Sequence, residues 1–407
     1  MKFIVVFLLA LSCARAADAA WHPLVLISLD GFRWDYADRH AAAAPTLRAL
    51  RREGAALEAL IPVFPSNTFP NHYTLVTGLY PARHGIVNND FYEPESQQFF
   101  HYNQPARALD PRWWRGEPIW VTAIKQGRRA ATAFWVGSEV EIGGVRPDFW
   151  QRFDYSIPFA DRLDRLVQWL SLPPGQRPDV VTFYLEETNG AGHRFGPDSP
   201  ELVAAVKLSD ERIAAILARL RAAGIEPNLV VVSDHGMTAT HVDRVVLIDD
   251  VVDRDALLIE SEGSVLAARP LRGDAPALAR ALGRLPHVRV HLAADLPARF
   301  HFKDSSRIAP VWVLPDEGWL VGTRANYERL KVRYRERGFL QGDHGYDPAL
   351  PSMHGILIAH GPAFRRGVVA PATENIHVYP LLCAVLGVKP AAVDGDDRLV
   401  RALLRAD

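Results

Sequence analysis

Apolar and amphipathic stretches alternate along most of the chain. Three runs are almost entirely apolar, the pattern of strands buried on both faces of a parallel sheet; they cover residues 24–29, 180–185 and 229–233. Three longer stretches repeat apolar residues at helical spacing, at 45–53, 159–170 and 200–222. This order predicts an α/β fold with a mostly parallel sheet flanked by helices on both faces.

The regular alternation is interrupted after the third apolar run. From 241 to 343 the chain offers short candidate strands, such as 265–267, and short helices, such as 275–285. An apolar stretch at 353–360 then has the character of another strand of the main sheet. We therefore expect one domain over residues 21–400 that includes a smaller inserted α+β subdomain at 241–343.

The first residues have the layout of a secretory signal. A basic start is followed by an apolar run at 3–11 and by the small-residue sequence Ala14-Arg15-Ala16. We expect residues 1–16 to be a cleaved signal peptide and the mature protein to be periplasmic or secreted. A lipid anchor at Cys13 is disfavoured, because Ala10 stands where such signals usually carry leucine. We expect no membrane span, since no stretch reaches the required length of about 20 apolar residues.

Charge and cysteine content exclude several classes of protein. Lys and Arg number 46 against 47 Asp and Glu, without blocks of like charge. We therefore expect no surface for duplex nucleic acid. Removal of a signal that contains Cys13 leaves Cys383 as the remaining cysteine, which excludes an internal disulfide bond. The sequence does not indicate an oligomeric state.

Polar residues follow the apolar runs at the points where the strands should end. Asp30 comes after the first run, Asn189 and His193 after the second, and Asp234 with His235 after the third. Parallel α/β sheets bind ligands at this edge. Carboxylate oxygen and imidazole nitrogen are ligands of zinc, and two zinc ions can hold the attacking and leaving oxygens of a phosphoryl transfer.

Each of these residues alone also has an ordinary structural explanation. Asp30 before a glycine suits a turn, and Asn89 within Asn88-Asn89-Asp90 suits another. A lone histidine such as His193 or His354 is more often a hydrogen-bonded residue than a metal ligand. Their occurrence together, with Asp and His adjacent after a buried strand, favours a metal site.

Six segments, taken in order, resemble the signatures of the nucleotide pyrophosphatase/phosphodiesterase family of the alkaline phosphatase superfamily. They are Asp30-Gly31-Phe32-Arg33, Thr68-Phe69-Pro70-Asn71-His72-Tyr73, Gly78-Leu79-Tyr80-Pro81-Ala82-Arg83-His84-Gly85, Gly192-His193, Ser233-Asp234-His235-Gly236-Met237 and His344-Gly345-Tyr346-Asp347. The resemblance covers residues 24–390. It implies an alkaline-phosphatase-like fold, with 21–400 as the catalytic domain, and hydrolysis of phosphodiester or pyrophosphate bonds with two zinc ions.

The resemblance also implies roles for individual residues. One zinc would be bound by Asp30, Thr68, Asp234 and His235, and the other by position 189, His193 and His354. Thr68 would be the nucleophile, and Asn89 would donate its amide to a phosphate oxygen. The base of a nucleotide would lie in an aromatic slot formed by Phe69, Phe153 and Tyr184.

The sequence departs from the family at position 189, where an aspartate is usual and this chain has Asn189. An amide offers a carbonyl oxygen but lacks the negative charge, so we expect weaker binding of the second zinc ion. Glu186 and Glu187 lie close in sequence and are candidates to compensate.

A threonine hydroxyl needs activation before it can attack phosphorus. The chain has no Gly-x-Ser-x-Gly elbow, so we expect Thr68 to be activated by zinc and to form a phospho-threonine intermediate. The expected substrates are small nucleotides, cleaved to nucleoside 5'-monophosphates. Three alternatives stay open: a phosphomonoesterase, a lipid-headgroup (choline-type) phosphodiesterase on the same core, and a protein whose catalysis is impaired by Asn189.

Overall fold

The computed structural model describes residues 21–406. The predicted signal peptide at 1–16 and the cysteine at position 13 lie outside these residues. Within them, no helix has both the length and the apolar character needed to span a membrane. Cys383 is buried and forms no disulfide bond in this part of the chain.

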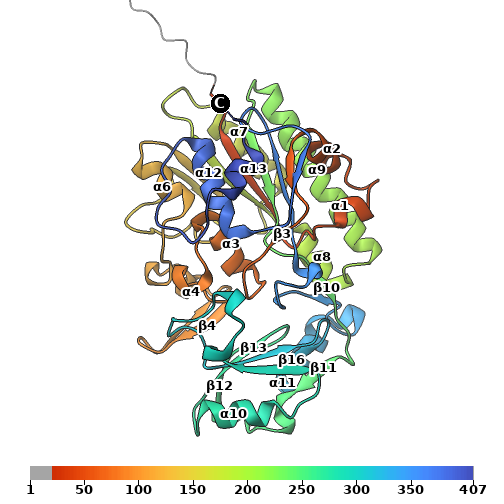
Figure 1. The fold of residues 1–407 in the computed structure, drawn as a ribbon. Coiled ribbons are helices and arrows are strands. Elements are labelled where there is room, and N and C mark those ends of the chain that lie inside the picture. Colours follow the sequence, from red (N-terminus) through yellow and green to blue (C-terminus); the bar gives the residue numbers. More distant parts are fainter. Residues whose placement is uncertain (1–20, 407) are drawn as a thin grey trace, which may run out of the picture.

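An eight-stranded sheet forms the centre of the larger part of the molecule (Figure 1). Its strands, in spatial order, are β19 (Val368–Ala370), β2 (Ala55–Leu57), β18 (Leu357–His360), β9 (Asn228–Val232), β1 (Leu24–Leu29), β8 (Val180–Leu185), β6 (Ala130–Ala133) and β7 (Phe149–Gln151). β1 lies between β8 and β9 and is parallel to both, whereas β18 is antiparallel to its two neighbours. The C-terminal ends of β1, β8 and β9 therefore meet at one edge of the sheet.

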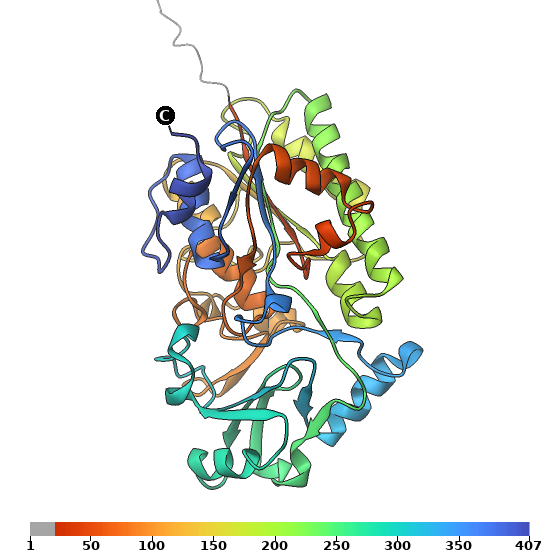
Figure 2. The same cartoon turned by 45° about the vertical axis from the view of Figure 1, so that its right-hand side comes forward.

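Alternate residues of β1 face two separate hydrophobic cores. Leu24 and Leu26 pack into one core, and Val25, Ile27 and Leu29 pack into the other. The first core is covered by α3 (Thr68–Thr77), α6 (Ile119–Lys125), α12 (Val378–Leu386) and α13 (Arg398–Leu403), and the second by α2 (Pro45–Glu53), α7 (Phe159–Leu170) and α9 (Pro200–Ala222). Figure 2 shows the two groups of helices on opposite sides of the sheet.

The predicted α/β architecture is confirmed by this sheet and its flanking helices. β1, β8, α2, α7 and α9 have the bounds that the apolar pattern predicts. The third strand is displaced by one residue, since β9 ends at Val232. Ser233 begins a turn instead, because its hydroxyl donates a 2.6 Å hydrogen bond to the carbonyl oxygen of His235.

The segment 241–343 contains a second sheet with its own helices, in the lower part of Figure 1. Its four antiparallel strands, in spatial order, are β12 (Leu257–Ser261), β13 (Leu266–Pro270), β15 (Val311–Pro315) and β14 (Val288–Leu292). α10 (Ala275–Leu282) packs on this sheet, β11 (Val245–Leu247) pairs with β16 (Leu320–Gly322), and α11 (Arg324–Arg333) follows.

The chain enters and leaves this segment through a short antiparallel pair of strands. These are β10 (Thr238–Ala239) and β17 (Gly342–Asp343), in which Thr238 is paired with Asp343. The pair brings residues 342–344 beside the segment that follows β9. The remaining α-helices and strands are α1 (Tyr36–Arg39), β3 (Leu60–Ile61), α4 (Pro81–His84), β4 (Asp90–Glu93), β5 (Gln98–His101), α5 (Pro105–Ala108), α8 (Glu187–Phe195) and β20 (Thr373–Glu374).

Candidate metal centre and active site

Three buried side chains gather where β1 and β9 end. The ligand atoms of Asp30, Asp234 and His235 lie within 4.8 Å of one another, and all three residues are almost completely buried. His235 Nε2 lies 3.0 Å from Asp234 Oδ2 and 3.4 Å from Asp30 Oδ1. We call these three residues the first metal group. The structure thus brings together the residues that the sequence places after two separate strands.

Thr68 joins this group from the first turn of α3. Its Oγ1 lies 3.2 Å from His235 Nε2. The loop before α3 is held by Asn71, whose side-chain amide donates to the carbonyl oxygens of Pro65 and Asn67 and whose Oδ1 accepts from the backbone N–H of Val63. The position of the Thr68 hydroxyl is therefore fixed by a hydrogen-bonded loop and by the first turn of α3.

The first metal group carries strongly perturbed ionisable groups. Burial, and then the nearby Asp234 carboxylate, raise the pKa of Asp30 to about 7. Burial disfavours the charged form of His235, but Asp234 and Asp30 outweigh this effect and raise its pKa to about 9. The buried carboxylates of Asp30 and Asp234 lie close together and repel each other. A divalent cation bound between them would neutralise this charge, so the group is suited to bind one.

A second group lies directly beside the first. The ligand atoms of His193, Asp343 and His344 lie within 4.8 Å of one another. His193 is on α8, whereas Asp343 ends β17 and His344 follows it. The ring of His344 stacks on that of His235, with centroids 3.5 Å apart. We call His193, Asp343 and His344 the second metal group; its closeness to the first suits a pair of ions that act on one phosphoryl group.

The histidines of both groups are oriented by backbone carbonyl groups. Nδ1 donates to Gly342 O in His193, to Gly236 O in His235 and to Ser66 O in His344, at 2.8, 2.8 and 3.0 Å. A carbonyl oxygen only accepts, so Nδ1 bears a proton, and in the neutral form of each ring Nε2 has the lone pair. Such an arrangement is typical of histidines that bind a metal through Nε2.

The prediction that His354 binds the second zinc ion needs correction. His354 Nε2 lies 2.9 Å from the carbonyl oxygen of Pro348, and the side chain lines a separate cavity together with Phe64 and Arg299. Neither of the metal groups found in residues 21–406 contains it. The chain has five His-Gly pairs; those that begin with His235 and His344 reach the metal groups, whereas the pair that begins with His354 does not.

Asn189 is placed beside Asp30 by close packing of α8 against the end of β1. Gly31 has a φ of +65°, and a Cβ atom there would lie 3.0 Å from the Cα of Asn189. The Oδ1 atoms of Asn189 and Asp30 are buried without a hydrogen-bond partner in the described part of the chain. Buried oxygens without partners are costly, and bound cations would satisfy them. These residues therefore fit a metal ion.

Glu186 and Glu187 do not compensate for the missing charge of Asn189. Glu186 forms an ion pair with Arg162, at 3.2 Å, and Glu187 forms one with Arg212. Both carboxylates are thus engaged by arginines, away from the metal groups. Asp343 is instead the carboxylate that the structure brings to the second group, and it was not predicted because it lies 154 positions away in the sequence.

Asn89 lies against the helix start that carries Thr68. Its Oδ1 accepts a 2.9 Å hydrogen bond from the backbone N–H of Phe69, and its own N–H donates to Asn88 Oδ1 at 2.8 Å. The N–H of Phe69 donates to Asn89, and Pro70 has no N–H. The N–H of Thr68 is therefore the backbone donor at the start of α3 that is free to bind a ligand. The side-chain amide of Asn89 and the N–H of Thr68 are both suited to donate to an anion.

The three predicted aromatic residues contact further exposed rings. Phe153 lies 6.0 Å from the ring of Tyr184 and 4.5 Å from that of Tyr155. Phe69 packs 5.5 Å from Tyr102. Phe153, Tyr155 and Tyr102 are 37%, 70% and 40% exposed, so they are accessible to a ligand. Tyr102 and Tyr155 were missed because single aromatic residues carry no recognisable pattern.

Tyr184 and His72 contact the first metal group directly. The hydroxyl of Tyr184 donates a 2.5 Å hydrogen bond to Asp30 Oδ2, a role beyond the predicted stacking surface. His72 is fully buried, with Nε2 2.8 Å from Ser28 Oγ and Nδ1 3.2 Å from Asp234 Oδ2. The sequence marks His72 only as part of a motif, so its contact with Asp234 appears first in the structure.

Comparisons with known proteins agree with this geometry. The family model "Type I phosphodiesterase / nucleotide pyrophosphatase" matches residues 24–347. A venom phosphodiesterase of Macrovipera lebetinus is 35% identical over 394 residues, which are 94% of this chain and 45% of the relative. A bis(5'-adenosyl)-triphosphatase of Xenopus laevis is 34% identical over 393 residues, 95% of this chain and 83% of the relative. The chain thus spans about half the length of the venom enzyme.

A solved structure extends the agreement to the whole fold. Murine ectonucleotide pyrophosphatase/phosphodiesterase 5, in an inactive form with threonine replaced by alanine and in complex with AMP, superposes with a TM-score of 0.87. It is 31% identical, and the match covers 94% of this chain and all of the murine chain. This chain belongs to the type I phosphodiesterase/nucleotide pyrophosphatase family of hydrolases, within the alkaline phosphatase superfamily.

Proposed function

We propose that this protein hydrolyses phosphodiester and pyrophosphate bonds of nucleotides to nucleoside 5'-monophosphates, with Thr68 as the nucleophile. The observation that carries the proposal is the position of Thr68 Oγ1, 3.2 Å from His235 Nε2 at the first metal group. The murine relative that is inactive after replacement of a threonine by alanine, and that binds AMP, supports both parts of the proposal.

Two zinc ions are the proposed cofactors. Asp30, Thr68, Asp234 and His235 would hold one ion, and His193, His344, Asp343 and the amide oxygen of Asn189 would hold the other. When bound, the ions stabilise the deprotonated hydroxyl and the charge of the phosphoryl group. In this assignment His344 replaces His354, and Asp343 supplies the second group with a negative charge that Asn189 lacks.

The reaction proceeds in two displacements at phosphorus. Thr68 Oγ1 forms a bond to phosphorus as the bond to the leaving oxygen breaks, and the hydroxyl proton passes to solvent. Water then attacks the phospho-threonine, and the P–Oγ1 bond breaks to restore the hydroxyl. Asn89 and the N–H of Thr68 donate to the non-bridging oxygens as their charge grows. Two inversions retain the configuration at phosphorus, so net inversion of a chiral thiophosphate substrate would exclude the covalent intermediate.

The exposed aromatic residues support a nucleotide substrate. Stacking of a base on one aromatic side chain is worth about 1–3 kcal/mol, and Phe153 with Tyr155 offers such a surface beside Tyr184. The Xenopus relative, named a bis(5'-adenosyl)-triphosphatase, supports dinucleoside polyphosphates as one substrate class.

A comparison of diester and monoester hydrolysis tests this function. With zinc supplied, we expect faster turnover of bis-p-nitrophenyl phosphate than of p-nitrophenyl phosphate, and faster turnover of dinucleotides and nucleoside triphosphates than of lysophospholipids or choline diesters. Preference for the monoester would instead identify a phosphomonoesterase on the same core.

We also propose that the protein acts outside the cytoplasm, in the periplasm or after secretion. The support is the signal-like sequence at 1–16. N-terminal sequencing of the protein recovered from periplasmic and culture fractions should give a chain that begins shortly after residue 16. Recovery of an uncleaved chain from the cytoplasmic fraction alone would contradict export.

A further inference from the structure

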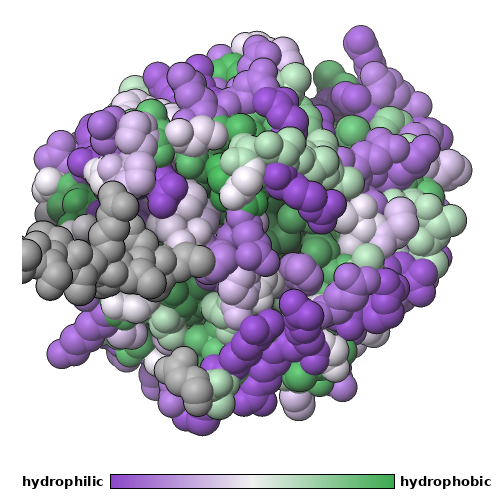
Figure 3. Space-filling view, turned by 90° about the horizontal axis from the view of Figure 1, so that it is seen from above, coloured by the Kyte–Doolittle hydropathy of each residue, from purple (hydrophilic) through white to green (hydrophobic). Residues whose placement is uncertain are grey.

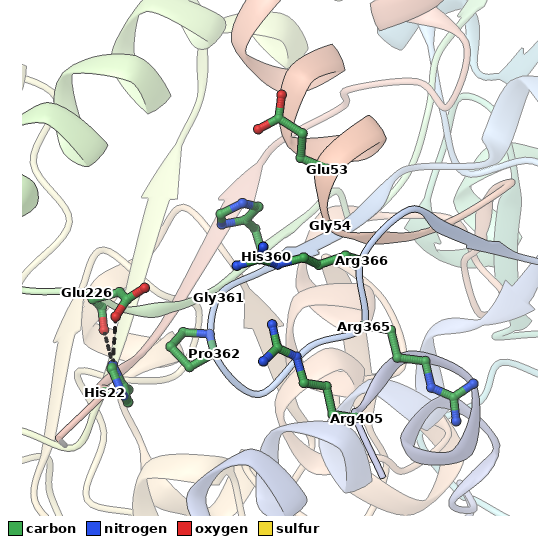
Figure 4. A pocket seen from close by; sticks show the side chains of 10 residues that line it. All are labelled: His22, Glu53, Gly54, Glu226, His360, Gly361, Pro362, Arg365, Arg366 and Arg405. Atoms are coloured by element: carbon green, nitrogen blue, oxygen red, sulfur yellow. Dashed lines mark hydrogen bonds and ion pairs between the residues drawn. The ribbon is translucent and has the colours of Figure 1, made fainter. Parts of the chain in front are cut away.

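A second cavity lies at the edge of the central sheet opposite to the metal groups (Figure 4). It has a volume of about 200 Å³. His22 and Glu226 precede β1 and β9, and His360 ends the antiparallel β18. Asp30 follows the other end of β1, so a strand length of about 20 Å separates this cavity from the metal groups.

The loop that forms the cavity floor is firmly anchored. A Cβ atom at Gly361 would lie 2.4 Å from the carbonyl oxygen of Pro227, so the two segments are in close contact. The N–H of Ala363 donates to Asn228 Oδ1 at 2.8 Å, and Phe364 is completely buried. The backbone of residues 361–364 is therefore fixed before any ligand arrives.

Three arginine side chains line the cavity, and hydrogen bonds to carbonyl oxygens hold two of them. Arg405 Nε donates to Phe364 O at 2.8 Å, and Arg365 Nε donates to Leu404 O at 2.7 Å. Each bond fixes a guanidinium group and leaves its terminal nitrogens available. Figure 4 shows Arg366 and Arg405 extending toward the same space beside His360, with Arg365 at one side.

Within the described residues, these arginines form no ion pairs. Within residues 21–406, no carboxylate oxygen lies within 4.0 Å of a side-chain nitrogen of Arg365, Arg366 or Arg405. Two glutamates also line the cavity: Glu53 pairs with Arg52 at 2.6 Å, and the Glu226 carboxylate lies 3.7 Å from His22 Nδ1, which donates to the carbonyl oxygen of Glu226. Figure 3 views this end of the molecule, where hydrophilic side chains surround apolar hollows.

We propose that this cavity binds a phosphate-type oxyanion, with Arg366 and Arg405 as its main donors. A guanidinium group presents paired N–H donors that match two oxygens of a phosphate. Two such groups around one small cavity suit a phosphate or pyrophosphate group, either free in solution or in the headgroup of an anionic lipid. The site is independent of the proposed catalytic function, because it shares no residue with the metal groups.

Calorimetric titration of the zinc-loaded protein with inorganic phosphate tests the site. In the double variant Arg366→Gln/Arg405→Gln we expect the affinity of one class of phosphate sites to fall by about tenfold or more. This is the effect of losing one hydrogen bond to a charged group. The matched control is Arg398→Gln/Arg401→Gln, which removes the same charge from α13, where both arginines pair with aspartates. An unchanged KM for bis-p-nitrophenyl phosphate in both variants shows that the metal groups are intact.

Sedimentation with lipid vesicles separates the two sources of the anion. Binding to phosphatidylglycerol vesicles but not to phosphatidylcholine vesicles, lost in Arg366→Gln/Arg405→Gln and kept in the control, supports a lipid headgroup as the ligand. A loss confined to the phosphate titration supports a free anion. If the double variant matches the wild-type protein in both assays, the proposal is overturned.

Discussion

The imidazole rings of His235 and His344 stack face to face, with centroids 3.5 Å apart and planes inclined by 14°. His235 belongs to the first metal group and His344 to the second. Each ring is fixed through Nδ1 by a backbone carbonyl oxygen. The stacked pair of rings therefore lies between the two metal groups and fixes the distance between them in the absence of a ligand.

Removal of His344 should cost the protein one metal ion. We expect His344→Ala to lower the zinc content by about one ion per chain, because Nε2 of this ring is a donor of the second metal group. His354→Ala is the matched control, since this ring faces Pro348 outside both groups. Elemental analysis after dialysis against limiting zinc measures the content. The opposite pattern, with zinc lost from His354→Ala and kept in His344→Ala, would refute the assignment.

A carboxylate at position 343 and one at position 189 should serve equally well as the source of negative charge for the second ion. We expect Asp343→Asn to lower the zinc affinity of the second metal group by at least about tenfold. A loss of this size already follows when a residue that only hydrogen-bonds to a metal ligand is removed. Adding Asn189→Asp to Asp343→Asn should restore binding, because a carboxylate then returns to the same group. Competition with a chelator gives both affinities.

The single variant Asn189→Asp shows whether the natural site is impaired. A gain in zinc affinity with little gain in diesterase rate indicates that Asp343 already serves the site. A large gain in rate would mean that Asn189 limits catalysis. Equal zinc affinity of the wild-type protein and Asp343→Asn would exclude Asp343 as a ligand.

Phe153 should contribute to binding of the base and not to the chemical step. Loss of one stacking contact of about 1–3 kcal/mol predicts a KM for a nucleotide substrate raised about fivefold or more in Phe153→Ala, with kcat little changed. Bis-p-nitrophenyl phosphate lacks a nucleobase and is the control substrate. A fall in kcat that is the same for both substrates would place Phe153 outside the base-binding surface.

The stability of the fold should fall in acid because of His84. This ring is fully buried; its Nε2 lies 3.0 Å from Thr74 Oγ1 and its Nδ1 accepts from the N–H of Ile86. Burial lowers the pKa of His84 to about 3, whereas an unfolded histidine has a pKa of about 6.5. Between pH 6.5 and pH 3, His84 is protonated in the unfolded chain but neutral in the folded chain. The stability that comes from the neutral, buried His84 is therefore complete above pH 6.5 and is lost as the pH falls toward 3.

Denaturant unfolding at several pH values checks this effect. The free energy of unfolding of the wild-type protein should decrease between pH 6.5 and 4 more steeply than that of His84→Gln, by up to about 1.4 kcal/mol per pH unit. His241→Gln, at a side chain that is 57% exposed, should keep the wild-type slope. Parallel curves for the wild-type protein and His84→Gln would contradict the prediction.

The main sheet was predictable because its strands are buried on both faces. Five of the six residues of β1 alternate between two cores, which requires apolar residues at these positions and leaves a clear signal; Ser28 is the exception. The helices α7 and α9 were equally clear, since each covers the sheet with one apolar stripe. The ligands that directly follow β1 and β9 could be predicted for the same reason.

Ligands supplied by the inserted segment could not be predicted from local patterns. Asp343 and His344 reach the site through β17, whose pairing with β10 is a long-range contact of two residues in each strand. His344 lies in a segment that resembles a family signature, but the resemblance alone gave it no role as a ligand, and the position of the whole segment decides between His344 and His354. Tyr184 was assigned to the base slot by its ring, but its hydroxyl contact with Asp30 depends on the register of β1 and β8.

The central claim is that Thr68 becomes covalently attached to phosphorus during turnover. Rapid acid quench of the zinc-loaded protein with a slow nucleotide substrate, followed by mass spectrometry of the peptide that contains residue 68, measures this directly. The account predicts a nucleotidyl group on Thr68 that is absent from Thr68→Ala, together with loss of turnover in that variant. Turnover by Thr68→Ala at a rate near that of the wild-type protein, with no adduct on the wild-type peptide, would contradict it.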